Sequence, residues 1–104
     1  MKVDYEECVF EELVNLSEPL ADIDEALAHR FLDACNQAFE FLSENPYLGS
    51  PGKFDNPELA EVQLWRIKSF EKYLVSYLPA AESITIVHVL HSATDYNRAF
   101  PTKN

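Results

Sequence analysis

The sequence predicts an α+β fold in which a helical hairpin covers one face of a largely antiparallel sheet. Three observations predict it. Two stretches of helical periodicity fill the first half of the chain, three alternating apolar stretches fill the second half, and only short connections separate those three. The chain has 104 residues, of which 47% are hydrophobic, a size and composition typical of a single domain spanning residues 1–104.

The first half begins with a weakly marked strand over Lys2–Tyr5 and continues with two helices. Glu7–Leu16 carries an apolar stripe, and Ser17-Glu18-Pro19 is expected to end or kink this helix because proline donates no backbone hydrogen bond. Asp22–Ser43 has the stronger periodicity, with Asp22 as candidate N-cap. Its apolar positions recur at spacings of three and four: Ile23, Leu27, Phe31, Ala34, Cys35, Ala38, Phe41 and Leu42.

The second half opens with a loop over Tyr47–Glu61 and then predicts three strands, Val62–Ser69, Lys72–Leu78 and Ile84–Leu90. Short connectors favour antiparallel neighbours, so the three strands should form a meander. The last strand is apolar on nearly both faces, which is typical of an interior strand. Alternation places four of its residues on one face: Ile84, Ile86, His88 and Leu90.

Charge and composition exclude several classes of function. The net charge is −10, and residues 1–44 hold twelve acids against two bases, so the chain repels phosphate backbones outside a local basic patch. The sequence lacks the run of about 20 apolar residues that spans a bilayer, and it has no secretory signal pattern, so a cytoplasmic location is expected. Cys8 and Cys35 lack metal-type spacing and are expected to be reduced. No metal or cofactor is predicted.

Polar residues near the predicted strand ends are the candidate functional residues. Arg66, His91 and Asp95 would combine a cation, an imidazole and a carboxylate, a set that can position a phosphate and move a proton. The alternative is a structural cluster in which Arg66 pairs with Asp95 and His91 bonds to the backbone. Four further residues are candidate binding residues: Trp65, Tyr73, Tyr77 and Arg98.

Several short motifs together resemble the RelE/ParE toxins of bacterial type II toxin–antitoxin systems, which act in plasmid stabilisation. The motifs are Glu12-Leu13 in the first helix, Pro46-Tyr47-Leu48-Gly49 after the second, Leu64-Trp65-Arg66, Tyr73-Leu74-Val75-Ser76-Tyr77, and the strand that runs from Ile84 through His91 to Asp95. The resemblance covers nearly the whole chain. It implies a β-α-α-β-β-β order, in which Lys2–Tyr5 is an edge strand, and it implies a cognate antitoxin.

The resemblance also implies two alternative activities. RelE-like members cleave messenger RNA on the ribosome with basic residues, whereas ParE-like members bind DNA gyrase. Here Thr94 stands where the family has an arginine before Asp95, and the chain is acidic, so a ParE-like protein-binding toxin is the first prediction. A RelE-like nuclease, with His91 moving the proton and Arg66 and Arg98 holding phosphate, is the second. A non-toxic relative that keeps only antitoxin binding is the third, and a homodimer stays open.

Overall fold

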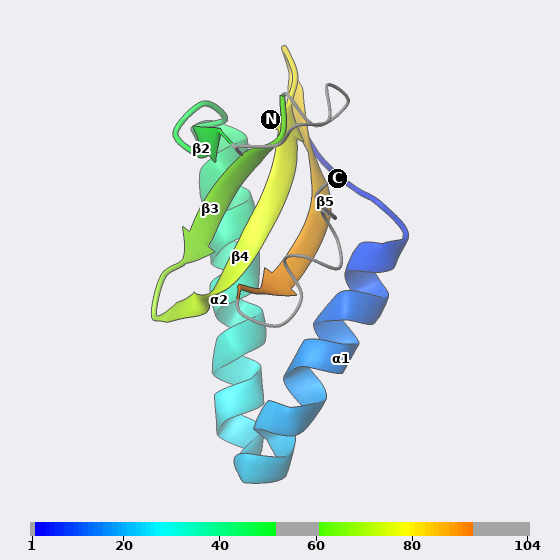
Figure 1. Cartoon of the computed structure of the whole chain (residues 1–104), viewed down its shortest axis with the longest axis vertical. Helices are drawn as coiled ribbons and strands as arrows, with labels where there is room; N and C mark the ends of the chain where they lie inside the picture. The colour runs from blue at the N-terminus through cyan, green and yellow to red at the C-terminus, as the bar shows by residue number, and fades with distance from the viewer. Residues whose placement is uncertain (1, 52–60, 93–104) are drawn as a thin grey trace, which may run out of the picture.

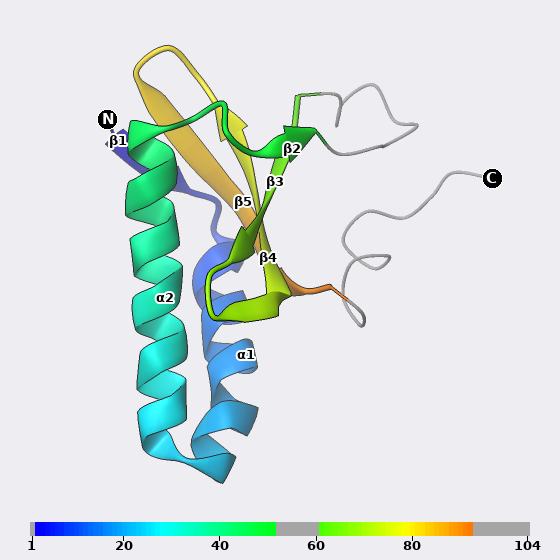
Figure 2. The same ribbon diagram turned by 90° about the vertical axis from the view of Figure 1, so that its left-hand side faces the viewer.

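Two helices and five strands make up the part of the chain that the structure describes. The computed structural model describes residues 2–51 and 61–92. The elements are β1 (Lys2–Tyr5), α1 (Cys8–Ile23), α2 (Glu25–Glu44), β2 (Ser50–Pro51), β3 (Gln63–Ile67), β4 (Phe70–Pro79) and β5 (Ser83–His91). The helices form a hairpin whose tip extends beyond the sheet (Figure 1), and α2 runs along one face of the sheet (Figure 2). The predicted α+β class is confirmed.

The strands form one mixed sheet in the order β1-β5-β4-β3-β2. β3, β4 and β5 pair as antiparallel neighbours, which confirms the predicted meander. β1 lies at the edge, as expected, and runs parallel to β5, with Lys2 opposite Ser83 and Tyr5 opposite Ile86. A parallel pair requires a long crossover, which the intervening helices and strands provide. β5 is therefore an interior strand over this stretch, which explains its apolar sequence.

A two-residue strand extends the opposite edge of the sheet. Ser50 pairs with Leu64 and Pro51 pairs with Gln63. The sequence predicts a loop over Tyr47–Glu61, and this prediction is wrong for Ser50 and Pro51, which form β2. Two residues cannot display an alternating pattern, and proline is tolerated in a strand only at an edge such as this one.

α1 does not end at Pro19. It continues to Ile23 with Pro19 inside it, so the predicted helix end is wrong. Proline removes one backbone hydrogen bond, but Leu16 and Leu20 on either side of it pack against the hydrophobic core and keep the segment helical. Within the described residues, neither helix is long and apolar enough to cross a membrane.

Asp24 separates the two helices. Its extended backbone (φ −166°, ψ 122°) ends α1, and its carboxylate accepts a hydrogen bond from the Ala26 N–H at 3.0 Å. It is thus the N-cap of α2, in place of the predicted Asp22. Asp24 lies two positions after Asp22, and α2 starts there because α1 continues past Pro19 to Ile23.

A bulge in the β4–β5 pairing divides the predicted apolar face of β5. His88 pairs with Ser76, while Ile86 pairs with Tyr77, so Val87 is an extra residue. Because neighbouring residues alternate between faces, Ile86 points toward the helices and His88 points toward the opposite face. The prediction that these residues share one face is wrong for this reason, and His88 is outside the main core.

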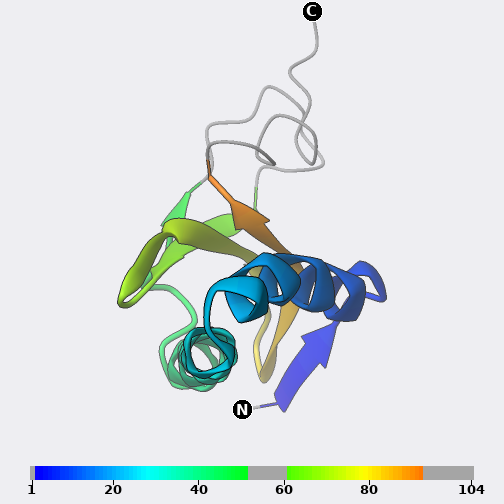
Figure 3. The same cartoon turned by 90° about the horizontal axis from the view of Figure 1, so that it is seen from below.

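The core lies between the helical hairpin and the sheet. Figure 3 shows α2 beneath the sheet, and α1 packs against β5. The largest side chains with no exposed surface come from α2 and the three long strands: Phe31, Leu42, Ile67, Tyr77, Ile84 and Ile86. Burying one such side chain stabilises the fold by roughly 1.5–3 kcal/mol, so these residues dominate the stability.

Cys35 of α2 is a free thiol in this core and is 1% exposed. Burial raises its pKa from 9.0 to about 12. Between those values the unfolded chain loses the thiol proton while the native chain keeps it. The free energy of unfolding should therefore fall by about 1.4 kcal/mol per pH unit in this range because of Cys35.

The measurement is urea denaturation of the wild-type protein and of Cys35→Ala at several alkaline pH values. The variant lacks the titrating thiol, so its stability should decline less steeply, and the two curves should converge as pH rises. Parallel curves would show that Cys35 does not retain its proton in the native protein.

Candidate functional site

The turn before α1 and the first turns of α1 complete the edge of β5 where β1 stops. The Ile86 carbonyl accepts a hydrogen bond from the Glu6 N–H at 3.0 Å. Beyond it, the Cys8 thiol donates to the Val87 carbonyl at 3.3 Å. The Glu12 carboxylate accepts from the Val89 N–H at 3.0 Å through Oε1. Side chains of a helix thus replace the missing strand and keep the backbone of β5 paired.

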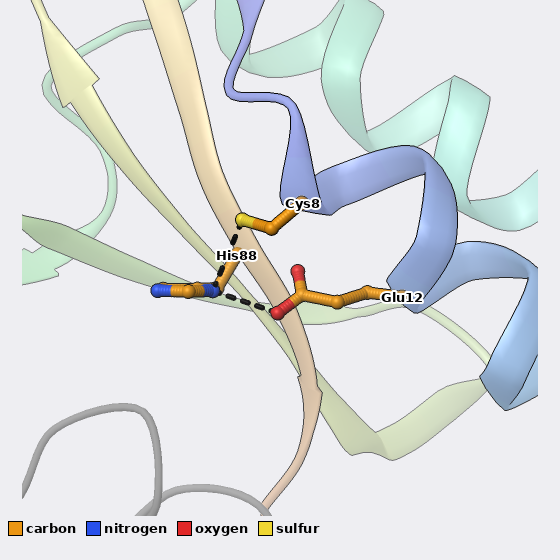
Figure 4. A group of neighbouring side chains, drawn as sticks. All are labelled: Cys8, Glu12 and His88. Atoms are coloured by element: carbon orange, nitrogen blue, oxygen red, sulfur yellow. Dashed lines mark hydrogen bonds and ion pairs between the residues drawn. The ribbon is translucent and has the colours of Figure 1, made fainter.

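His88 joins two of these side chains in a cluster (Figure 4). Its Nδ1 lies 2.7 Å from Glu12 Oε2 and 3.6 Å from Cys8 Sγ. Cys8 and Glu12 are four residues apart in the sequence, so both project from the same side of α1 toward β5. The His88 and Glu12 side chains are 23% and 22% exposed, so solvent reaches the cluster.

The bonding pattern assigns the protons in this cluster. An ionised carboxylate only accepts hydrogen bonds, and Glu12 accepts one from the Val89 backbone, so His88 carries a proton on Nδ1 and donates it to Glu12. Burial raises the pKa of the Cys8 thiol, and the Glu12 carboxylate raises it further, with smaller contributions from Glu6 and Glu11. Cys8 is therefore a neutral thiol at pH 7 and is not activated as a nucleophile.

A groove runs between α2 and the β3–β4 hairpin. The rings of Phe41 and Trp65 meet there, with centroids 5.4 Å apart, and Phe41 is 40% exposed. The charged residues Arg30, Asp33 and Lys68 also line it. The other lining residues are mostly apolar or small: Leu27, Ala34, Gln37, Ala38, Ser69 and Phe70. A partly exposed aromatic pair beside mixed charges is typical of a surface that binds protein.

The structure places the predicted catalytic residues Arg66 and His91 on opposite faces of the sheet. Arg66 pairs with Leu74, and His91 pairs with Tyr73, the next residue along β4. Successive residues of a strand point to opposite faces, so the two side chains do not converge. Arg66 is exposed and donates from Nη1 to the Glu71 carbonyl at 2.6 Å. The Arg66 guanidinium therefore makes this hydrogen bond within the β3–β4 hairpin.

The predicted binding residues differ in their burial. Trp65 lines the groove, whereas Tyr73 packs between Phe31 and His91, with ring centroids 4.8 Å and 5.2 Å away. Tyr77 has no exposed surface. Trp65 and Tyr73 are both partly exposed, and of the three residues Trp65 is the one that lines the groove. Asp95 and Arg98, like Thr94, lie outside the described residues.

The hydroxyl of Tyr77 joins two motifs that are far apart in the sequence. It donates to the Pro46 carbonyl and accepts from the Gly49 N–H, each at 2.9 Å. Burial raises the pKa of Tyr77, and the Gly49 bond opposes this rise. The Pro46–Gly49 motif is thereby fixed to the C-terminal part of β4, so Tyr77 holds the loop that follows α2.

Sequence reasoning missed the clustering of Cys8, Glu12 and His88, and it missed the exposure of Phe41 in the groove. The spacing of Cys8 and Glu12 was available as a signal, since it places both on one helix face. A histidine inside an apolar strand was a second signal. Neither signal shows that His88 meets Cys8 and Glu12, because His88 is 76 residues from Glu12 in the sequence.

A family model matches most of the chain. The family model described as the ParE toxin of type II toxin-antitoxin system, parDE, matches residues 9–96. A search of curated proteins found no match. The matched range begins in α1, includes all the later elements, and extends past β5.

Proposed function

The chain belongs to the ParE toxin family of type II toxin–antitoxin systems, and from this membership we propose that it arrests growth by binding a protein target, with DNA gyrase as the candidate, and that a cognate antitoxin neutralises it. Gyrase and the antitoxin are cytoplasmic partners in a bacterial cell, so the proposal includes a cytoplasmic location. No catalytic residue is required, because binding alone would block the target.

The separation of Arg66 from His91 is the observation that favours a protein-binding toxin over an RNA-cleaving one. A nuclease needs its cations and its proton carrier to reach the same scissile phosphate. Arg66 and His91 project from opposite faces of the sheet, and Arg66 is bonded to the hairpin backbone. The net charge of −10 further disfavours RNA binding, which depends on neutralising phosphates.

The groove between α2 and the β3–β4 hairpin supports a protein-binding mode and is our candidate antitoxin site. Phe41 and Trp65 offer aromatic surface to an apolar anchor residue of a partner. The adjoining face of α2 is acidic, with Asp33 in the groove and the exposed Glu40 and Glu44 beside Phe41. The groove lining itself holds two bases, Arg30 and Lys68, against Asp33. An antitoxin segment bound here should therefore place an acidic residue near these two bases, basic residues over Glu40 and Glu44, and at least one large apolar side chain in the groove.

Induced expression in a bacterial host, with and without the neighbouring reading frame, tests the proposal. Expression alone should arrest growth, and co-expression of the antitoxin should restore it. Purified protein should then inhibit DNA supercoiling by gyrase and leave messenger RNA intact on programmed ribosomes. Cut messenger RNA with unaffected gyrase would reject the proposal in favour of the RelE-like nuclease.

Thr94→Arg is the matched variant, because it restores the residue that the family carries before Asp95. Growth arrest by the wild-type protein would show that the arginine is not needed for toxicity. Arrest by Thr94→Arg alone would identify a toxin inactivated at this one position and contradict the proposal for the wild-type chain. If neither protein slows growth while both accumulate in folded form, the non-toxic antitoxin-binding relative is the correct assignment.

A further inference from the structure

The cluster at the junction of α1 and β5 has the donor atoms of a metal site. It brings together a thiol, a carboxylate and an imidazole, and one ligand atom from each lies within 4.8 Å of the other two. We propose that Cys8, Glu12 and His88 bind one Zn²⁺ ion, with water as the fourth ligand, and that the ion links α1 to β5. This proposal is independent of the toxin's target.

The distances support a tetrahedral site. Zinc lies about 2.3 Å from a thiolate sulfur and about 2.0–2.1 Å from an imidazole nitrogen, which requires a sulfur–nitrogen separation of about 3.6 Å at a tetrahedral angle. Cys8 Sγ and His88 Nδ1 are 3.6 Å apart. Glu12 Oε2 lies 2.7 Å from His88 Nδ1 in a hydrogen bond, whereas two such ligand atoms on one tetrahedral zinc are about 3.3 Å apart, so Glu12 would retreat by about 0.6 Å as the metal replaces the proton between them.

The surrounding structure holds the ligands in position. The second carboxylate oxygen of Glu12 is held by the Val89 N–H, an outer contact of the kind that orients metal ligands. Cys8 and Glu12 share one side of α1, and His88 is fixed by its pairing with Ser76 in the sheet. Little rearrangement is therefore needed to bind the ion, which keeps the entropic cost of binding low.

The charges around Cys8 favour a divalent cation. The carboxylates of Glu12, Glu6 and Glu11 all act on the thiol, and each disfavours its negative form. Zinc reverses this balance because it stabilises the thiolate and is attracted by the same carboxylates. On binding, Cys8 releases one proton to solvent, and His88 binds as the neutral imidazole through Nδ1 with its proton on the other ring nitrogen. Zinc undergoes no change of oxidation state.

Cobalt(II) titration of the untagged full-length chain tests the site, because cobalt reports thiolate ligation by its absorption spectrum. The wild-type protein should show a sulfur-to-cobalt charge-transfer band and tetrahedral d–d bands at one equivalent, and Zn²⁺ should abolish both. Cys8→Ser should lack the charge-transfer band. Cys35→Ala is the matched control, since it removes the other thiol, buried in the core, and should leave the spectrum unchanged.

Glu12→Gln provides a second readout that a folding defect would not mimic. Its amide oxygen can still accept the Val89 N–H, so the helix–strand contact is kept while the metal-binding charge is lost. We expect zinc to raise the Tm of the wild-type protein and to affect Glu12→Gln much less, with circular dichroism confirming that the variants fold. A charge-transfer band that persists in Cys8→Ser, the absence of any band in the wild-type protein, or equal Tm shifts in wild type and Glu12→Gln would overturn the proposal.

Discussion

Replacing Tyr77 with phenylalanine is expected to lower the free energy of unfolding by about 1–3 kcal/mol. The ring stays in the core, but the Pro46 carbonyl loses its donor and the Gly49 N–H loses its acceptor. Both groups lie beside a side chain with no exposed surface, so water is poorly placed to replace the hydroxyl. Urea denaturation of the purified variant gives the value.

Gly49→Ala should destabilise the same contact for a different reason. A Cβ at this position would clash with the Tyr77 hydroxyl oxygen and would lie 2.9 Å from Cε1 of the same ring. Contacts this short force the loop or the ring to move, at a cost of about 1–3 kcal/mol or more. Glycine is therefore required here by close packing on Tyr77.

The double variant Tyr77→Phe/Gly49→Ala tests whether Gly49→Ala acts through a clash with the Tyr77 hydroxyl or through general damage to the loop. Removing the hydroxyl relieves the shortest clash, so Gly49→Ala should cost less in the Tyr77→Phe background than in the wild-type protein. Tyr47→Phe is the control, because Tyr47 is 71% exposed and its change should stay within about 0.5 kcal/mol. Additive costs in the double variant would contradict the contact described here.

Phe41→Ala is expected to weaken antitoxin binding about 30-fold or more, which corresponds to about 2 kcal/mol. Phe41 is 40% exposed and presents its ring beside Trp65 in the groove, so a partner's apolar anchor would bury both rings. Titration calorimetry of the toxin with the antitoxin encoded beside it measures the change. The loss should be mainly in the dissociation rate, because the ring adds contact area without long-range attraction.

Ile23→Ala is the matched control for this prediction. Ile23 is 75% exposed at the end of α1 and is not among the residues that line the groove, so its truncation removes a comparable apolar side chain elsewhere. It should change the dissociation constant less than about threefold. If Ile23→Ala weakens binding as much as Phe41→Ala, the antitoxin occupies the helical hairpin tip and not the groove. The Tm of each variant should be measured first, so that unfolding is not mistaken for lost binding.

The order of elements was predictable because it depends on local periodicity. Alternation identified the three strands of the meander, and spacings of three and four identified both helices. The limits of these elements were less predictable. Pro19 predicts a helix end, but the packing of Leu16 and Leu20 on the core overrides that local preference. Asp24 becomes the helix N-cap only because α1 continues past the proline.

The sequence also identified the motifs that carry the family resemblance, and the family match over residues 9–96 confirms the type of protein. It grouped Arg66 with His91 because both lie near strand ends. The pairing register separates them, since Arg66 is opposite Leu74 and His91 is opposite Tyr73. A one-residue difference in register decides the face on which a side chain lies, and no local pattern fixes that register across two turns.

The sequence by itself determined the class of fold, the strand order of the meander and the acidic character of the helices, and the family resemblance implied the edge position of Lys2–Tyr5. Only the tertiary structure decided which distant side chains meet. The bulge at Val87 turns His88 away from the core, and α1 then brings Cys8 and Glu12 to it because β1 ends at Tyr5 and leaves the edge of β5 to be completed. Side-chain clusters depend on register, bulges and the packing of helices on a sheet, and these are set by contacts between segments far apart in the chain.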